Sequence, residues 1–172
     1  VLCENIIDSQ AYNNYILYSS NEYYGNASKT YYANNYYYSS IRKWLNDDFY
    51  NTAFTDTQKK NIETTHLNNN CYSSSYPQYN APASDDKVFL LSYDEARNSS
   101  YGFSSSAGTS DTARRAQGTD YAKCQGLWVS TSSSYYGNSW WWLRSPYGDS
   151  GLACGVYIGG SSDNRDYVDY TL

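Results

Sequence analysis

Histidine and cysteine, which carry much of enzyme chemistry, are sparse in this sequence and stand far apart. His66 is the only histidine, and no cysteine or serine stands beside it in ETTHLNN that it could activate as a nucleophile. The chain also has no HExxH, GxSxG or phosphate-binding glycine motif. We therefore predict that the protein is not an enzyme and that His66 is a structural residue at or near the surface.

The cysteines and acidic pairs give only weak metal-site signals. No CxxC pair or Cys/His pattern occurs, so no zinc site is predicted. Asp85, Asp86 and the DNRD turn offer clustered carboxylates that suit calcium, but EF-hand spacing is absent and the simpler interpretation is a solvated loop. We predict no cofactor. The four cysteines are Cys3, Cys71, Cys124 and Cys154. They either form disulfides in an exported protein or are free thiols in the core.

The segment SWWWLRSP, residues 139–146, places three tryptophans in succession. Side chains alternate between the faces of a strand, so Trp140 and Trp142 share one face, while Trp141 and Leu143 share the other. We expect Trp141 and Leu143 to pack inward and Trp140 and Trp142 to point outward. The alternative is a sheet that is covered on both faces and buries all three tryptophans.

Outward tryptophans beside tyrosines would form a binding surface, because Trp and Tyr are favoured anchors at interfaces. The tyrosines that follow in the sequence are Tyr147, Tyr157, Tyr167 and Tyr170. Tyr occurs 23 times against four Phe and no Met, in loops rich in Ser, Asn, Asp and Gly. This composition is typical of antibody-type binding loops, or else reflects low-complexity drift in loops that tolerate small polar residues.

The elements that must position these residues are predicted to be short. A strand is expected over 1–7, then a loop to about residue 38. Ser40 is the predicted cap of a helix over 41–50 that buries Trp44 and Leu45. Further signals are a capping box at Thr55 and Gln58 that begins a helix, a buried strand over 87–92, a capping box at Ser92 and Glu95, and a short helix over 111–118.

The C-terminal part of the chain reads as an antiparallel meander. Its strand-length segments are LWVSTSS, SWWWLRS, LACGVYI and DYVDYTL, which alternate with turn sequences. A chain of 172 residues fits one domain. The net charge of −5 argues against nucleic acid as a partner, and no apolar segment is long enough to span a membrane.

The chain resembles a bacterial family of unknown function that is abundant in surface or exported proteins of gut bacteria. The resemblance rests on SSIRKWLNDDFYNTAFTDTQKKNI, DKVFLLSYDEA, ARRAQGTDYAKCQGLWVS and SWWWLRSP, in this order. That family closes with a Gly-Val-Arg-Pro segment, so the resemblance implies that residues 1–172 are one domain from a longer surface protein, with flanking strands missing. It also implies an extracellular or cell-surface location.

The order of short helices followed by a tryptophan-rich strand is similar to the C-type-lectin-like fold of formylglycine-generating enzymes and of the variable proteins of diversity-generating retroelements. The resemblance implies an α+β fold with short helices, a C-terminal antiparallel sheet and long irregular loops. It makes Trp141, Leu143, Arg144, Ser145 and Pro146 scaffold residues. The implied ligand-binding residues, some of them diversified, are Trp140, Trp142, Tyr147, Asp149, Leu152, Tyr157, Tyr167 and Tyr170.

The predicted function is a non-enzymatic module that displays aromatic residues from this C-terminal sheet and its loops to a protein or glycan. The alternative is a structural or adhesive surface domain with no specific small ligand.

Overall fold

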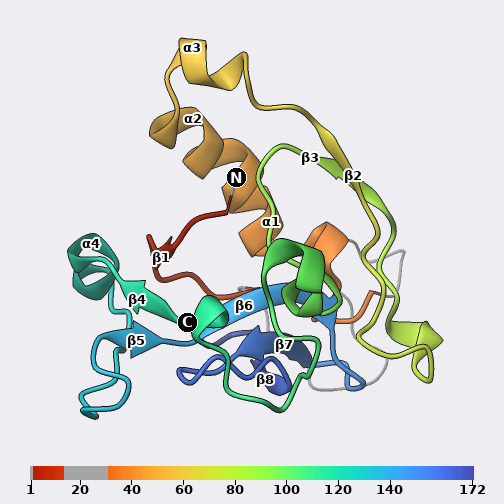
Figure 1. Ribbon diagram of the computed structural model, residues 1–172. Helices are drawn as coiled ribbons and strands as arrows, with labels where there is room; N and C mark the ends of the chain where they lie inside the picture. Colours follow the sequence, from red (N-terminus) through yellow and green to blue (C-terminus); the bar gives the residue numbers. More distant parts are fainter. Residues whose placement is uncertain (1, 14–30) are drawn as a thin grey trace.

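A computed structural model describes residues 2–13 and 31–172, and these residues form an α+β fold of short helices and small sheets (Figure 1). The helices are α1 Ser40–Trp44, α2 Tyr50–Ala53, α3 Asp56–Lys59 and α4 Asp120–Cys124. The strands are β1 Asn5–Ile6, β2 Thr65–Leu67, β3 Ser84–Asp86, β4 Ala116–Gly118, β5 Asn138–Ser139, β6 Trp141–Pro146, β7 Leu152–Val156 and β8 Asn164–Tyr167. The predicted α+β class is confirmed.

The predicted helix over 41–50 forms as part of a longer helical segment. A π-helical stretch, Leu45–Phe49, joins α1 to α2. The cap lies one residue earlier than predicted: the Ser39 hydroxyl accepts a hydrogen bond from the Arg42 N–H at 3.3 Å, and Ser40 is the first helical residue. Leu45 is buried as expected, while Trp44 is half-buried.

Both predicted capping boxes are present. Thr55 N–H donates to Gln58 Oε1 at 2.9 Å, and Gln58 N–H donates back to Thr55 Oγ1 at 3.3 Å at the start of α3. Ser92 N–H donates to Glu95 Oε2 at 2.8 Å, and Glu95 N–H donates to Ser92 Oγ at 3.1 Å. The second box opens the 3-10 turn Glu95–Arg97.

Strands β6, β7 and β8 form an antiparallel meander, with β7 in the middle, and β6 and β7 match the predicted strands SWWWLRS and LACGVYI. The third strand is shifted: β8 is Asn164–Tyr167, and only its last two residues belong to the predicted strand DYVDYTL. Trp142 pairs with Gly155, and Cys154 pairs with Arg165. The three strands run together in the lower part of Figure 1, while α1, α2 and α3 rise above them. Of the residues that the sequence predicts to bind ligand, Trp142, Leu152 and Tyr167 lie in these strands, and the others lie just beyond the strand ends or in the connecting turn.

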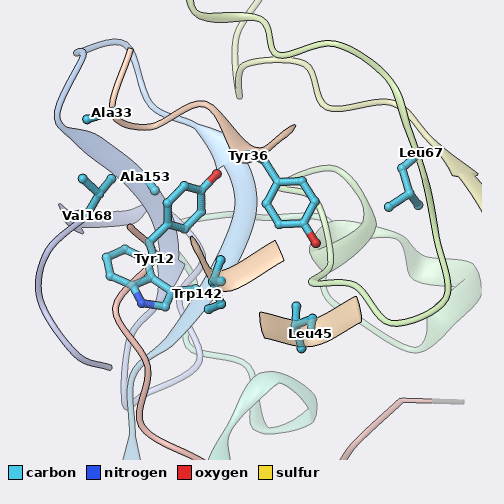
Figure 2. Packing of buried hydrophobic residues seen from close by; sticks show 9 residues of the cluster. Tyr12, Ala33, Tyr36, Leu45, Leu67, Trp142, Ala153 and Val168 are labelled. Atoms are coloured by element: carbon cyan, nitrogen blue, oxygen red, sulfur yellow. The ribbon is translucent and has the colours of Figure 1, made fainter. Parts of the chain in front are cut away.

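One face of this sheet is covered by the N-terminal segment and α1. Trp142 is only 3 % exposed, its indole N–H donates to Gln10 O at 3.2 Å, and its ring lies 5.6 Å from that of Tyr12. Figure 2 shows Tyr12 beside Trp142, with Tyr36 and Leu45 in the same cluster. The outward orientation expected for Trp142 is therefore wrong, because residues far away in the sequence cover this face.

The other face of the sheet is covered as well. Leu143 and Val156 are fully buried there, and Tyr72 and Tyr93 pack against them. Trp141 packs against this cluster, and its indole N–H donates to Arg114 O at 3.0 Å. Trp141 and Leu143 thus pack inward, as predicted.

Several predicted elements differ from the structure. Residues 87–92 form no strand. Val88, Phe89 and Leu90 pack against one core cluster and Leu91 against the other, so this segment bridges the two clusters. The helix predicted over 111–118 is a 3-10 turn, Thr112–Arg114, followed by β4, which pairs with β1 and β5. Pairing with two strands takes residues 116–118 out of any helix.

Two further predicted strands are shortened or absent. The predicted strand over 1–7 is reduced to β1. LWVSTSS forms no strand, because Ser130 N–H donates to Asn138 O at 2.8 Å and Gly137 N–H donates to Ser130 O at 2.9 Å, which closes a loop before β5. Sequence reasoning missed α4, which Thr119 caps, and the antiparallel pair of β2 and β3.

None of the four cysteines forms a disulfide. Cys71 and Cys154 are buried as small core residues, whereas Cys3 and Cys124 are exposed. Within residues 2–13 and 31–172, no helix has both the length and the apolar character that crossing a membrane requires.

Candidate functional site

Four tyrosines, one leucine and one arginine form a group where β6 turns into β7 and where β8 ends. We call it the tyrosine patch and define it as Tyr72, Tyr147, Leu152, Arg165, Tyr167 and Tyr170. Each of these side chains is at least partly exposed. Four of them belong to the predicted set of ligand-binding residues.

Tyr147 is the centre of the stacked part of the patch. Its ring lies nearly parallel to that of Tyr72, with centroids 4.5 Å apart and planes 10° apart, and the guanidinium carbon of Arg165 lies 4.9 Å from the Tyr147 centroid. Tyr72 and Arg165 therefore both pack on the ring of Tyr147. Burial and the hydrogen bond to Tyr147 raise the pKa of Tyr72 to about 12, so its hydroxyl stays protonated at neutral pH.

The open part of the patch lies along β8. Tyr167 is paired across the sheet with Leu152, and it shares a face of β8 with Arg165 because the two are two residues apart. The rings of Tyr167 and Tyr170 meet edge to face at 5.7 Å, and the two residues are 41 % and 50 % exposed. These rings are thus accessible to a ligand.

Asn34 holds the turn between β6 and β7 from the interior. Its Nδ2 lies 3.3 Å from Tyr147 O, 2.7 Å from Asp149 O and 3.0 Å from Leu152 O. Its backbone N–H donates to Ser150 O at 3.1 Å. A fully buried amide with this many turn acceptors fixes the backbone that carries Tyr147 and Asp149.

Two buried arginines also support the sheet. Arg144 pairs with Glu95 through both carboxylate oxygens. Arg114 donates to five carbonyl groups, those of Ala96, Ser104, Ser106, Thr109 and Gly160. Burial lowers the pKa of Arg114, against the opposing effect of the nearby Asp111. Both arginines are therefore framework residues, as the resemblance implied for Arg144.

A second aromatic pair lies at the opposite end of β7. Trp140 is half-buried and meets Tyr157 edge to face at 5.0 Å. The five residue steps from Leu152 to Tyr157 correspond to about 17 Å of strand. Trp140 and Tyr157 therefore do not join the tyrosine patch.

The structure thus divides the predicted ligand-binding residues into three groups. Trp142 is in the core, which removes it from the accessible surface. Trp140 and Tyr157 form their own pair. Those gathered at the turn and along β8 are Tyr147, Asp149, Leu152, Tyr167 and Tyr170.

Sequence reasoning missed two members of the patch. Arg165 and Tyr167 are two residues apart in DNRDY, so in a strand they lie on the same face, and the sequence did contain a signal for Arg165. Tyr72 had no such signal, because it comes from an irregular segment 75 positions before Tyr147 in the sequence.

The histidine and the candidate calcium residues have other partners. His66 Nδ1 lies 2.7 Å from Asp85 Oδ1 across β2 and β3, and both side chains are exposed. Asp86 is buried and pairs with Arg42 at 2.7 Å. In the part of the chain that the structure describes, no three His, Cys, Asp or Glu residues converge as a metal site would require.

Comparison with known proteins gives a family and no function. No curated protein and no solved structure matches the chain. The family model for a domain of unknown function, DUF6273, matches residues 4–172, which is nearly the full sequence. The chain therefore belongs to the DUF6273 family.

Proposed function

We propose that this domain is a non-enzymatic binding module that presents the tyrosine patch to a protein or glycan ligand. The observation that carries the proposal is the grouping of exposed Tyr167 and Tyr170 with the stacked Tyr147 and Arg165 at one end of a rigid sheet. Tyrosine offers a large amphipathic contact surface at a low cost in side-chain entropy.

The support beneath the patch favours recognition. Asn34 fixes the turn, and β8 is paired along its length with β7. A preorganised surface loses less conformational entropy on binding than a mobile one. The aromatic side chains can therefore contribute most of their contact energy to the ligand.

The wider assignment follows from the same resemblance. We propose a C-type-lectin-like fold in a bacterial cell-surface or extracellular protein, with residues of the patch as positions of diversification. Short helices that precede an antiparallel sheet support the fold assignment. The framework roles of Leu143 and Arg144 beside exposed Tyr167 and Tyr170 support a division into constant and variable positions.

One observation favours the alternative, a structural or adhesive domain with no specific small ligand. Trp142 is buried, and other exposed aromatic residues stand on separate segments instead of joining the patch. These residues are Tyr101, Tyr121, Trp128 and Tyr136. A domain of this kind would bind nothing through the patch.

The test is a binding screen on arrays of purified glycans and of purified mucin, collagen and fibrinogen. The wild type is compared with a Tyr167→Ser, Tyr170→Ser double variant and with Tyr136→Ser, which changes a tyrosine that is 72 % exposed outside the patch. We expect the double variant alone to lose the wild-type signals, with all three proteins equally folded by circular dichroism. Signals that survive in the double variant, or a wild type that binds nothing, support the structural alternative.

A further inference from the structure

Arg165 differs from the other five arginines of the chain. Within the described ranges, its guanidinium group has no hydrogen-bond or ion-pair partner. The others have carboxylate or carbonyl partners: Arg42 with Asp86, Arg97 with Asp94, Arg114 with five carbonyls, Arg115 with Gly159 O, and Arg144 with Glu95. Arg165 is thus an exposed arginine with no direct carboxylate or carbonyl partner among the described residues.

The position of Arg165 nonetheless favours a defined orientation. Its guanidinium group lies over the ring of Tyr147, which is itself stacked on Tyr72. Stacking of this kind restrains the planar group and leaves its N–H donors free at its edges. A planar fork of free donors matches the two oxygens of a carboxylate.

The rings beside Arg165 offer a second kind of contact. Tyr72 and Arg165 both pack on the Tyr147 ring, which leaves less of this ring for a ligand. Tyr167 and Tyr170 meet edge to face and are about half exposed, which leaves ring surface for the apolar C–H groups of a sugar. Asp149, exposed in the adjacent turn, can accept hydrogen bonds from hydroxyl groups.

The surrounding charge limits how acidic the ligand can be. Four aspartates lie in the β6–β7 turn or in and next to β8: Asp149, Asp163, Asp166 and Asp169. They would repel a strongly acidic peptide, which carries many carboxylates close together. A sugar acid has one carboxylate per ring, surrounded by neutral hydroxyl groups.

We propose that the tyrosine patch binds an acidic glycan, with the sugar carboxylate on Arg165 and the pyranose ring against Tyr167 and Tyr170. This inference rests on the proposed function and specifies its ligand. A charge-assisted, two-pronged contact of this type is worth about ten-fold in affinity. It should weaken as salt screens the charges.

The test is titration calorimetry of the same domain with matched acidic and neutral probes. The acidic probes are trigalacturonate and sialyllactose, and their neutral counterparts are fully methyl-esterified trigalacturonate and lactose. Triglutamate serves as the acidic peptide. The Arg165→Gln variant is compared with Arg115→Gln, which removes another arginine that stacks on a tyrosine, Tyr135.

We expect at least one acidic sugar to bind about ten-fold more tightly than its neutral counterpart, with this preference lost in Arg165→Gln and kept in Arg115→Gln. Equal binding of acid and ester, tighter binding of triglutamate, or no binding of either sugar acid overturns the inference. The array screen separates this failure from failure of the proposed function. If neutral glycans or proteins bind and this binding requires Tyr167 and Tyr170, the domain is still a binding module, but its ligand is not an acidic glycan.

Discussion

Arg144 and Glu95 form a two-pronged ion pair that joins β6 to the segment covering one face of the sheet. Arg144 Nη1 lies 2.5 Å from Glu95 Oε2, and Nη2 lies 2.7 Å from Oε1. The Arg144 side chain is 3 % exposed and that of Glu95 28 %. Arg144 Nη1 also donates to Leu90 O at 2.8 Å, so one arginine holds both ends of the 90–95 segment.

Removal of the Arg144 guanidinium group should therefore strongly lower the stability of the fold. In Arg144→Met the Glu95 carboxylate loses its partner while still largely buried, and we expect the free energy of unfolding to fall by about 3 kcal/mol. Urea denaturation measures this change. Lys43→Met removes a solvent-exposed ion pair with Asp47 and should cost less than about 1 kcal/mol. Similar losses in the two variants would show that the Arg144 pair is not a main support of the fold.

The same pair should make stability depend on pH. Burial alone would raise the pKa of Glu95, but the hydrogen bonds from Arg144 and Ser92 lower it below its ordinary value. Since the folded pKa is the lower one, the contribution of Glu95 is fully present above the unfolded pKa, near 4.5, and is lost as the pH falls through the folded pKa. Unfolding free energies of wild type and Glu95→Gln should converge at acidic pH. A constant difference across the pH range would contradict this assignment.

The tryptophans provide a direct test of the buried sheet face. Trp142 is 3 % exposed and Trp128 is 59 % exposed. We expect acrylamide to quench Trp128 readily in the folded protein and to leave Trp142 shielded. Trp128→Phe should therefore remove quenchable emission, whereas Trp142→Phe should increase the quenchable fraction of what remains. The opposite pattern would place Trp142 on the open surface that the sequence predicted.

The elements that the sequence predicts well are those defined by neighbouring residues. Thr55 with Gln58 and Ser92 with Glu95 form their boxes within four residues, so local chemistry determines them. Alternation likewise correctly grouped Trp141 with Leu143 on one face of β6. Patterns of this range need no knowledge of the remaining chain.

The failures involve partners that are distant in sequence. Alternation tells which side chains share a face but not whether a face is covered, and Tyr12 covers Trp142 from 130 positions away. The stack of Tyr72 on Tyr147 has the same origin. The candidate site was therefore only partly predictable: Tyr147, Tyr167 and Tyr170 were candidates because they follow the tryptophan strand in the sequence, whereas the stack on Tyr147 depends on tertiary packing.

Thiol chemistry should separate the cysteines into two classes. Cys3 and Cys124 are exposed and should react quickly with a thiol reagent in the folded state. Cys71 and Cys154 are buried, and burial raises the pKa of both thiols, which lowers the thiolate fraction that reacts. We expect reaction of the second pair only on unfolding, measured by mass spectrometry of labelled peptides. Rapid labelling of Cys154 in the native protein would contradict its core position.

Two glycines with nearly the same positive φ should respond very differently to substitution. Gly102 has φ of +88° and Gly160 has φ of +85°, so alanine is strained at both, at a cost of about 1 kcal/mol. A Cβ at Gly102 would meet no atom within 4 Å, whereas a Cβ at Gly160 would clash with the backbone oxygen of Asp111.

The clash at Gly160 cannot be relieved locally. Asp111 precedes the 3-10 turn that carries Arg114, and Arg114 Nε donates to Gly160 O at 2.6 Å, so both sides of the contact are tied to the same buried arginine. We therefore expect Gly160→Ala to lower the free energy of unfolding by about 3 kcal/mol or more, and Gly102→Ala by about 1 kcal/mol. Urea denaturation measures the free energy of unfolding of both variants. Because both glycines have positive φ, the difference between the two losses reports the clash alone. Equal losses would mean that the 104–114 segment can move away from Gly160, and that the carbonyl cage around Arg114 is less rigid than its hydrogen bonds indicate.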